Sequence, residues 1–389
     1  MVYDWIVVGG GIQGTAIAAF LVKNNKVSPG KLRIIDPHKM PLFQWIKNTE
    51  KIGMKFLRSP FVHHLDVDPF SLRNFCSESP NGKKSEFYGM YKRPSLEIFN
   101  DHSQSLFQGL GLGESWHQGY VNGIDRANDE WNISLDEGDR LKSKKVVLAL
   151  SINDQLYVPE WADSIMHENN QLFHIFDEAA DFSALQPPIS VVGGGITAAH
   201  TAIKLSALYP GQVTLIKRHP FRVCDFDSDP GWLGPKYQKN YQRIQDYSER
   251  REVIKKARNR GSLPSELFHK LRKLENDKKL NITDGEITSV KESENKVLIL
   301  SVDTQQVKAH SIVLATGFRP SRPGGSWLES AIEKFALPCA KCGYPIVSQS
   351  LEWCPHLYVM GPLAELEIGP IARNISGARQ AAERIVRSV

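Results

Sequence analysis

The stretch YDWIVVGGGIQG, residues 3–14, decides the fold, because an apolar run breaks there at a glycine-rich turn. Residues 16–21 then continue with helical periodicity, so the local order is strand, tight turn and helix. In this arrangement Gly9 permits the turn, Gly11 lets a pyrophosphate approach the backbone, and Gly14 lets the helix pack close to the strand. The free N–H groups at the start of the helix attract an anion. The stretch therefore predicts a dinucleotide-binding unit of the Rossmann type.

An acidic residue follows the next apolar run. Residues 32–35 read as a second strand, and Asp36 comes directly after it. An acid about 20 residues beyond the glycine-rich turn accepts hydrogen bonds from ribose hydroxyls. We therefore expect Asp36, together with Gly9, Gly11 and Gly14, to complete a site for a diphosphate and its ribose.

The same pattern recurs in the middle of the chain. An apolar strand at residues 189–192 leads into the turn GGGITA, residues 193–198. Gly193, Gly195 and Ala198 take the three positions of the motif, and residues 199–208 have helical periodicity. The sequence therefore predicts a second dinucleotide-binding unit.

Basic side chains replace the acid at the end of the strand that follows, residues 213–216. Lys217 and Arg218 come first, with His219 and Arg222 slightly beyond them. Groups of this kind can neutralise a 2′-phosphate, which favours NADP over NAD. The alternative is that they are solvated loop charges and that the coenzyme is NAD.

A third landmark is the apolar strand at residues 312–314, which ends in Ala315, Thr316 and Gly317. At this point the order of parts resembles the flavoproteins with two dinucleotide-binding domains, which include thioredoxin-reductase-like enzymes and flavin-containing monooxygenases. The resemblance implies FAD at the first turn, NADPH at the second, and cofactor contacts from Thr316 and Gly317. It also implies an α/β fold of two Rossmann-like domains. The NAD(P)H-binding domain, residues 166–317, is inserted into a discontinuous FAD-binding domain, residues 1–165 and 318–389.

The C-terminal region carries further positions that this resemblance assigns to the cofactor. A strand at residues 357–360 ends at Gly361, and Gly369 and Pro370 precede a helix that we predict over residues 371–386. In the flavoproteins that it resembles, the start of such a helix points at the flavin, where its dipole stabilises negative charge on the reduced ring. The resemblance therefore implies flavin contacts from Gly361, Gly369, Pro370 and Ile371.

Three segments resemble the lysine and ornithine N-hydroxylases in particular: MKFLRSP at 54–60, HHLD at 63–66, and FH at 173–174. The resemblance implies that NADPH reduces FAD and that O₂ is then used to oxygenate a nitrogen or sulfur nucleophile. Arg58 and His64 become candidates for the flavin and nicotinamide face, although His63 and His64 can equally be structural. The chain is short for this group and lacks its full motif around His174.

Two other functions stay open. One is a reductase that passes electrons from NAD(P)H to a protein, a quinone or a disulfide. The other is a flavin-binding regulatory protein with little turnover. The disulfide reductases of this architecture carry a redox-active CxxC against the flavin, whereas Cys339 and Cys342 come after the ATG segment. With Cys354 and His356 they offer four ligand types for zinc, but the spacing matches no established motif, and we predict no metal site.

Residues 238–260 form a charged and broadly helical stretch. Basic side chains in such a stretch most often solvate a surface. The alternative is a lid over NADPH, with phosphate contacts from Lys236, Arg250, Arg251 or Arg258. The preceding WLGP, residues 232–235, would then cap a substrate cavity.

The composition excludes several other classes. In 389 residues, 48 Lys and Arg stand against 43 Asp and Glu, a net charge of +5 that is too small and too interspersed to favour nucleic acid. The first residues show no signal-peptide pattern, and no stretch of about 18 apolar residues occurs. We expect a cytoplasmic protein that binds neither nucleic acid nor membrane. Its partner would be a small-molecule substrate or electron acceptor, with O₂ if it is a monooxygenase.

Overall fold

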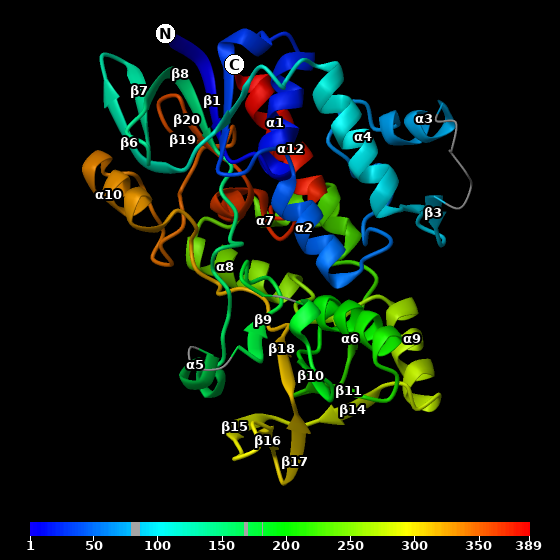
Figure 1. Ribbon diagram of the computed structural model, residues 1–389. Helices are drawn as coiled ribbons and strands as arrows, with labels where there is room; N and C mark the ends of the chain where they lie inside the picture. Colours follow the sequence, from blue (N-terminus) through cyan, green and yellow to red (C-terminus); the bar gives the residue numbers. More distant parts are fainter. Residues whose placement is uncertain (79–85, 167–169, 181) are drawn as a thin grey trace.

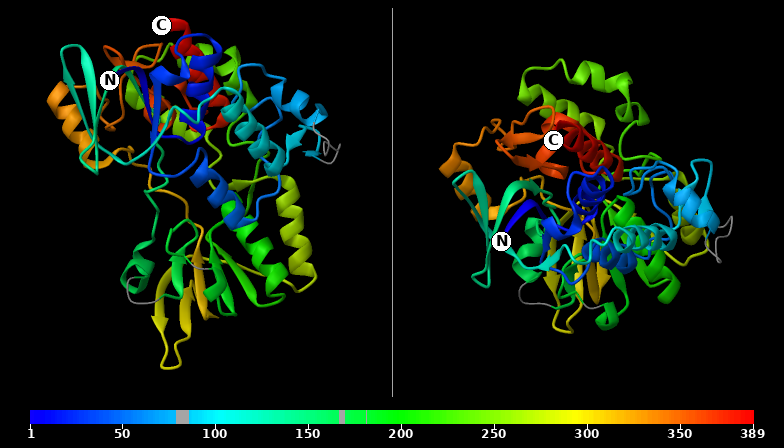
Figure 2. Two further views of the ribbon diagram at one scale, coloured as in Figure 1. Left: turned by 45° about the horizontal axis from the view of Figure 1, so that its top comes forward. Right: turned by 90° about the horizontal axis from the view of Figure 1, so that it is seen from above.

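The computed structural model describes residues 1–78, 86–166, 170–180 and 182–389. It has two lobes, each built around a mainly parallel sheet, and both chain termini lie on the first lobe (Figures 1 and 2). The chain passes to the second lobe after β8 and returns after β18 (Figure 1). The predicted α/β fold with two dinucleotide-binding units, one inserted into the other, is confirmed.

The first lobe contains a sheet of strand order β19-β20-β8-β1-β2-β5, to which β7 and β6 add next to β8. The contacts of β1 with β2 and β8, of β2 with β5, and of β8 with β20 are parallel. Residues 5–8 of β1 are all buried, as expected for a parallel strand that is covered on both faces. The strands are β1 (Val2–Val8), β2 (Leu32–Asp36), β5 (Trp116–Gln118), β6 (Val121–Ala127), β7 (Glu130–Leu135), β8 (Arg140–Leu148), β19 (Glu352–Cys354) and β20 (Leu357–Val359).

Helices α1 and α12, from opposite ends of the chain, pack against each other in this lobe (Figure 1). Their contact closes the lobe, because the C-terminal segment returns beside the first strand. The helices that belong to the lobe by sequence are α1 (Ile12–Lys23), α2 (Phe43–Ile52), α3 (Ser71–Glu78), α4 (Leu96–Gly109), α10 (Gly325–Phe335), α11 (Glu365–Ile368) and α12 (Ile375–Ser388), with 3-10 turns at η1 (Pro29–Lys31) and η5 (Gly361–Ala364). A short pair, β3 (Phe87–Tyr88) and β4 (Arg93–Pro94), lies beside α4.

The second lobe contains a parallel sheet of order β14-β11-β10-β18-β9. A three-stranded antiparallel sheet lies at its far end (Figure 1). The strands are β9 (Leu172–His174), β10 (Ile189–Val192), β11 (Val213–Lys217), β14 (Asn281–Asp284), β15 (Ile287–Glu292), β16 (Leu298–Val302), β17 (Gln305–Ala309) and β18 (Ser311–Leu314). The helices are α5 (Glu160–Met166), α6 (Ile196–Leu208) and α9 (Ser265–Asn276), with a 3-10 turn at η3 (Phe182–Ala184).

One segment leaves the second lobe and packs on the first. Between β12 (Arg222–Val223) and β13 (Ser262–Leu263), the chain forms η4 (Pro230–Leu233), α7 (Pro235–Tyr241) and α8 (Tyr247–Ala257). Trp232, Tyr241 and Ile254 of this excursion belong to the hydrophobic core of the first lobe. In the opposite sense, α5 packs against β9 and β15 of the second lobe. The proposed division at residues 165/166 and 317/318 therefore follows the two sheets but not the packing of these two segments.

The predicted start of the last helix is wrong. The chain forms the short helix α11, turns, and begins α12 only at Ile375, so Pro370 lies in the turn. Gly369 ends α11 with a φ of +87°, a conformation that favours glycine, and Asn374 precedes α12 with an extended backbone. The helical periodicity of the sequence was right, but the glycine marks the end of one helix and not the start of the next.

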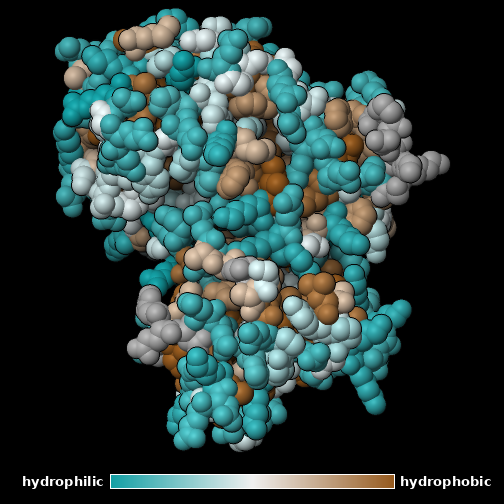
Figure 3. Space-filling model, in the orientation of Figure 1, coloured by the Kyte–Doolittle hydropathy of each residue, from teal (hydrophilic) through white to brown (hydrophobic). Residues whose placement is uncertain are grey.

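The surface in Figure 3 is mostly hydrophilic, with apolar patches on the upper lobe and near the boundary between the lobes. Within the described ranges, no helix has the length and apolar character needed to cross a membrane.

Candidate functional site

The first glycine-rich turn has the geometry that a diphosphate site needs. Gly9 has a φ of +103°, and a Cβ there would lie 2.6 Å from the carbonyl oxygen of Ala149. A Cβ on Gly14 would lie 1.7 Å from the carbonyl oxygen of Gly9, so only glycine lets α1 approach the strand this closely. A Cβ on Gly11 would meet no atom within 4 Å, and this residue is exposed. The turn is therefore closed against the protein and open on the side where the motif receives a pyrophosphate.

Asp36 lies at the end of β2, beside this turn. Its Oδ2 accepts a hydrogen bond from the backbone N–H of Gly10 at 2.7 Å. Its Oδ1 accepts from the backbone N–H of His38 at 3.0 Å and lies 2.7 Å from Nδ1 of the same residue. A carboxylate has about four acceptor positions, so capacity remains for a ribose hydroxyl. The residues of the first turn thus fit the adenosine diphosphate part of FAD.

The C-terminal segment docks on the same turn. Gln13 of α1 donates through Nε2 to the carbonyl oxygen of Ala372 at 3.1 Å. Gly361 has a φ of +61°, and a Cβ there would approach the Gln13 side chain to 3.1 Å. The four predicted flavin contacts Gly361, Gly369, Pro370 and Ile371 are all buried. Because α12 begins later than predicted, its N-terminal turn belongs to Ile375 and not to Ile371.

The second glycine-rich turn has a backbone similar to that of the first, but another segment of the chain lies over it. Gly193 has a φ of +148°, and a Cβ there would lie 2.5 Å from the carbonyl oxygen of Ala315. Ala198 is fully buried where α6 meets β10. A Cβ on Gly195, however, would lie 3.2 Å from Cα of Gly261, which ends the excursion. The loop after α8 therefore lies over the second turn.

The basic strand end divides into one buried and one exposed cation. The Lys217 side chain is 2% exposed, and its ammonium is hydrogen-bonded to the carboxylate of Asp284 on β14. Arg218 is exposed, and the ring of His219 lies near Gly194 of the turn. Arg218 therefore remains a candidate for a 2′-phosphate, whereas Lys217 would first have to leave Asp284.

Thr316 and Gly317 connect the two chain passages between the lobes. The Thr316 hydroxyl donates to the carbonyl oxygen of Tyr157, and the Tyr157 N–H donates to the carbonyl oxygen of Gly317 at 3.0 Å. Leu156 and Phe318 form an antiparallel bridge next to them. The predicted cofactor residues Thr316 and Gly317 thus also hold the outgoing and returning segments together.

Arg58 is committed to protein acceptors. It donates to the carbonyl oxygens of residues 224–226, to Asp227 Oδ1 at 2.6 Å and to Ser262 Oγ at 2.9 Å. Its side chain is 12% exposed, and burial lowers its pKa although the Asp227 charge raises it. Arg58 therefore fastens the excursion to the loop after α2. Contact with a nicotinamide would have to come from another residue.

His64 is fully buried, with both ring nitrogens satisfied. Its Nε2 lies 3.1 Å from the carbonyl oxygen of Pro69, and its Nδ1 accepts from the Asp66 N–H at 3.2 Å. This pattern fits a neutral ring, and burial lowers its pKa to about 4. His64 is thus positioned as a structural histidine, one of the two alternatives that the sequence left open.

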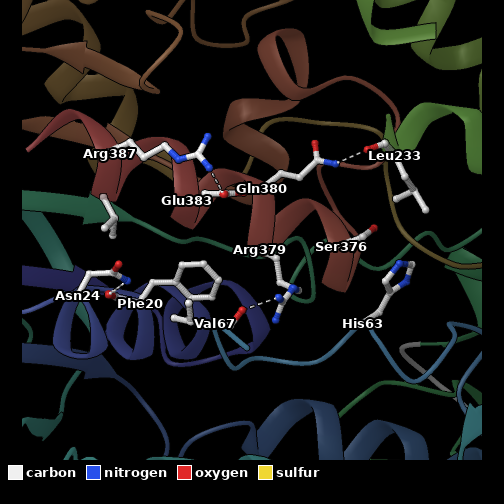
Figure 4. A pocket seen from close by; sticks show the side chains of 11 residues that line it. Phe20, Asn24, His63, Val67, Leu233, Ser376, Arg379, Gln380, Glu383 and Arg387 are labelled. Carbon is white, nitrogen blue, oxygen red and sulfur yellow. Dashed lines mark hydrogen bonds and ion pairs between the residues drawn. The ribbon is translucent and has the colours of Figure 1, made fainter. Parts of the chain in front are cut away.

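His63, in contrast, lines a cavity of about 380 Å³ between α1, α12 and η4 (Figure 4). The Arg379 guanidinium in this cavity donates to the carbonyl oxygens of residues 64, 66 and 67. Gln380 donates to the Leu233 carbonyl oxygen at 3.0 Å, and Arg387 pairs with Glu383 (Figure 4). Most polar groups of this cavity are therefore already bonded within the protein.

The excursion contributes a buried ionic cluster that the sequence analysis missed. Glu365 is 0% exposed, and its Oε2 accepts from Arg251 at 2.9 Å and from Arg373 at 2.8 Å. Arg258 lies 3.5 Å from its Oε1. We call these four residues the Glu365 cluster. A signal was present in the sequence, because an acid between Ala364 and Leu366 in a buried apolar run requires cationic partners.

The expectation of a solvated helical face is wrong for these basic residues. Arg250 is buried and pairs with Glu367 at 2.9 Å, while Arg251 and Arg258 face Glu365. These contacts hold the excursion against the C-terminal segment, as the alternative of a lid requires. Lys236, the fourth candidate, lies instead over the ring of Tyr237.

The late cysteines are free thiols in the structure. Cys342 is exposed, whereas Cys339 and Cys354 are partly buried, and burial raises the pKa of Cys339 and raises that of Cys354 to about 11. Among the residues that the structure describes, no three His, Cys, Asp or Glu side chains are grouped so that they could hold a metal ion.

Comparisons with known proteins agree with this geometry. Residues 6–153 match a family model described as FAD-NAD(P)-binding. A search of curated proteins finds no match to the chain. The chain therefore contains an FAD/NAD(P)-binding domain at the first turn.

Solved structures give the architecture of the whole chain. The FAD-bound cadaverine monooxygenase DfoA from Erwinia amylovora has a TM-score of 0.79 at 14% identity, and the match covers 100% of this chain and 94% of DfoA. The ornithine hydroxylase PvdA from Pseudomonas aeruginosa has a TM-score of 0.79 at 17% identity, over 100% of this chain and 98% of PvdA. A bacillithiol disulfide reductase from Staphylococcus aureus reaches 0.64 at 15% identity, with coverages of 100% and 98%. The fold is that of the two-domain FAD/NAD(P)-binding oxidoreductases.

Proposed function

We propose that this protein is an oxidoreductase that uses NADPH to reduce FAD and that, as a monooxygenase, oxygenates a nitrogen or sulfur nucleophile with O₂. The observation that carries this proposal is the pair of glycine-rich turns, one in each lobe, whose closest approaches tolerate only glycine. Reduced flavin, when bound, supplies the electrons and the activation of O₂. Two fold matches with a TM-score of 0.79, to proteins named as a cadaverine monooxygenase and an ornithine hydroxylase, support this branch, whereas the disulfide reductase reaches 0.64 and a flavin-containing monooxygenase 0.63.

In this proposal the residues of the chain bind and orient the two cofactors. Gly9, Gly11 and Gly14 receive the diphosphate of FAD, and Asp36 accepts from its ribose. Gly193, Gly195 and Ala198 do the same for NADPH, with Arg218 on the 2′-phosphate and Lys217 behind it against Asp284.

The excursion is the part of the chain suited to cover the reaction. Trp232 is 8% exposed and packs on Tyr237 and Tyr241, and the excursion contacts the C-terminal segment through Tyr241 and Gln238. A packed segment of this kind can exclude water from a site that lies between the lobes. Arg58, bonded to residues 224–227, would hold its base in place.

Anaerobic reduction by NADPH, followed by rapid mixing with O₂, tests the proposal. We expect NADPH to bleach the flavin. With O₂, the spectrum should pass through a transient that differs from both the oxidised and the reduced flavin. Cadaverine and ornithine, the substrates named for the two similar structures, are the first amines to supply, with hydroxylamine product as the readout.

The other outcomes are distinct. Direct return to oxidised flavin without a transient, together with rapid turnover of artificial electron acceptors, would overturn the monooxygenase and favour a reductase. FAD binding with negligible NADPH oxidation would indicate a regulatory flavoprotein.

A further inference from the structure

The Glu365 cluster holds more positive charge than its carboxylate can neutralise. Arg251 and Arg373 both donate to the same oxygen, Oε2 of Glu365. Arg258 has only the longer contact of 3.5 Å to Oε1 and makes no side-chain hydrogen bond to any residue in the described ranges. One carboxylate thus faces three guanidinium groups. The residues of the cluster therefore carry a net charge of +2, and Asp227 is a further acidic group that raises the pKa of Arg258.

This excess lies where charges are poorly solvated. The side chains of Arg258 and Arg373 are 17% and 13% exposed, and that of Glu365 is 0% exposed. Burial, and then the neighbouring Arg373, lower the pKa of Arg258. Nη1 of Arg258 and Nε of Arg373 are buried without a hydrogen-bond partner, as is Oε1 of Glu365, which lies 3.5 Å from Nη1 of Arg258. Unpaired donors on buried cations are unfavourable, and an anion between the two arginines would offset this cost.

Each of the two arginines belongs to a segment that contacts one of the two glycine-rich turns. Arg373 stands between Ala372 and Asn374, whose carbonyl oxygens accept from Gln13 at the first turn, at 3.1 and 3.5 Å. Arg258 precedes by three residues Gly261, which covers Gly195 of the second turn. The cluster therefore joins the segment that docks on one cofactor turn to the loop that covers the other.

We propose that Arg258 and Arg373 bind an anionic group of the substrate, a carboxylate or a phosphate, at the junction between the two cofactor sites. The identification of the anion as part of a substrate rests on the proposed function, whereas the anion-binding site itself does not. Oxygen anions suit the site because two guanidinium groups offer several N–H donors in planar forks. Arg251 and Glu365 act as positioning residues, because Arg251 donates to Oε2 of Glu365, the oxygen that Arg373 also contacts.

The test uses the full chain with FAD and saturating NADP⁺, so that both dinucleotide turns are filled. Sodium phosphate and sodium acetate, at constant ionic strength, are the probes, and flavin absorbance and thermal unfolding are the readouts. Wild type is compared with Arg258→Gln and Arg373→Gln. Arg384→Gln is the matched control, because Arg384 pairs with Glu367 at 3.2 Å outside the cluster.

We expect at least one probe to perturb the flavin spectrum and raise the unfolding temperature of wild type and Arg384→Gln. The half-saturating concentration of this probe should rise about tenfold or more in the two cluster variants, because each variant loses one charge-assisted contact to the anion. Response to acetate alone identifies a carboxylate ligand, and response to phosphate alone identifies a phosphate ligand.

Two results would overturn the inference. In the first, all four proteins respond to the probes alike or not at all. In the second, the cluster variants lose affinity for FAD or NADP⁺ and keep their response to the probes, which assigns the arginines to a cofactor. If a glutamine variant does not fold, Arg258→Lys keeps the charge and should retain partial probe binding. Failure of the proposed function would appear separately, as wild type that binds the probe but is not reduced by NADPH.

Discussion

The two glycine-rich turns share a backbone and differ in what surrounds them. At the first, Gly11 faces open space and Asp36 accepts from the turn itself. At the second, Gly195 lies under Gly261, and Lys217 is turned away to Asp284. The first turn is thus formed within one lobe and is open at Gly11. The second is completed by a segment anchored in the other lobe, so its ligand must share space with the excursion.

The strongest way to break this comparison is to place a side chain in each turn. Gly11→Val would put its side chain in open space, so we expect a folded protein that has lost FAD, with affinity lower by about 100-fold or more. Gly195→Val should instead keep FAD and lose NADPH. Flavin absorbance after gel filtration in excess FAD, and titration with NADPH, measure the two.

A Gly11→Val protein that retains its yellow colour would show that the first turn is not the FAD site. Loss of FAD in both variants would remove the distinction between the turns.

The anchoring of the excursion can be tested at Arg58. Arg58→Met removes five hydrogen bonds between the loop after α2 and residues 224–262, and we expect the free energy of unfolding to fall by about 3 kcal/mol. Arg272→Met is the control, because the exposed pair of Arg272 with Glu275 is worth about 0.5 kcal/mol. Urea unfolding measures both. If Arg58→Met keeps its stability but slows flavin reduction by NADPH, a catalytic role for Arg58 is restored.

Both lobes should lose stability in acid for the same reason. His64 in the first lobe and His174 in the second are fully buried, and burial lowers the pKa of each to about 4. Because the unfolded chain takes up these protons near pH 6.5, the contribution of each histidine is present above that pH. It is lost as the pH falls from 6.5 toward 4.

Between pH 7 and pH 5 each histidine should account for about 2 kcal/mol of this loss. His64→Asn and His174→Asn should each flatten the pH dependence of the unfolding free energy by that amount, whatever their stability at pH 7. An unchanged slope in either variant would mean that this histidine is not buried as a neutral ring. His63, His102 and His200, whose pKa is also about 4, contribute to the slope that remains.

The smallest effect concerns the choice of coenzyme at the second turn. Arg218→Ala should raise the KM for NADPH about tenfold and leave that for NADH nearly unchanged, because one charge-assisted contact to the 2′-phosphate is lost. Lys217→Met tests the other basic residue and should act on stability, since its ammonium faces Asp284. Steady-state kinetics with both coenzymes decide the point, and an equal rise for NADPH and NADH in Arg218→Ala would contradict it.

Local sequence was sufficient to predict a structural feature wherever one continuous segment forms the whole feature. The strand, glycine turn and helix at residues 2–23 and 189–208 follow from apolar periodicity and from glycines that no other residue can replace. The order of the three landmarks along the chain led to two units, one inserted in the other. The same local reasoning misplaced the start of α12, because Gly369 and Pro370 fit a helix end and a helix start equally well.

Only the tertiary structure decided what each side chain meets. Arg58 and His64 look like active-site groups in sequence, yet Arg58 bonds to residues 224–227 and His64 to Pro69 and Asp66. The sequence by itself determined the two dinucleotide turns, since their requirements are met within about 35 residues. The Glu365 cluster joins residues more than 100 positions apart. Its charged side chains meet only because distant segments pack together, and a local sequence pattern cannot predict that packing.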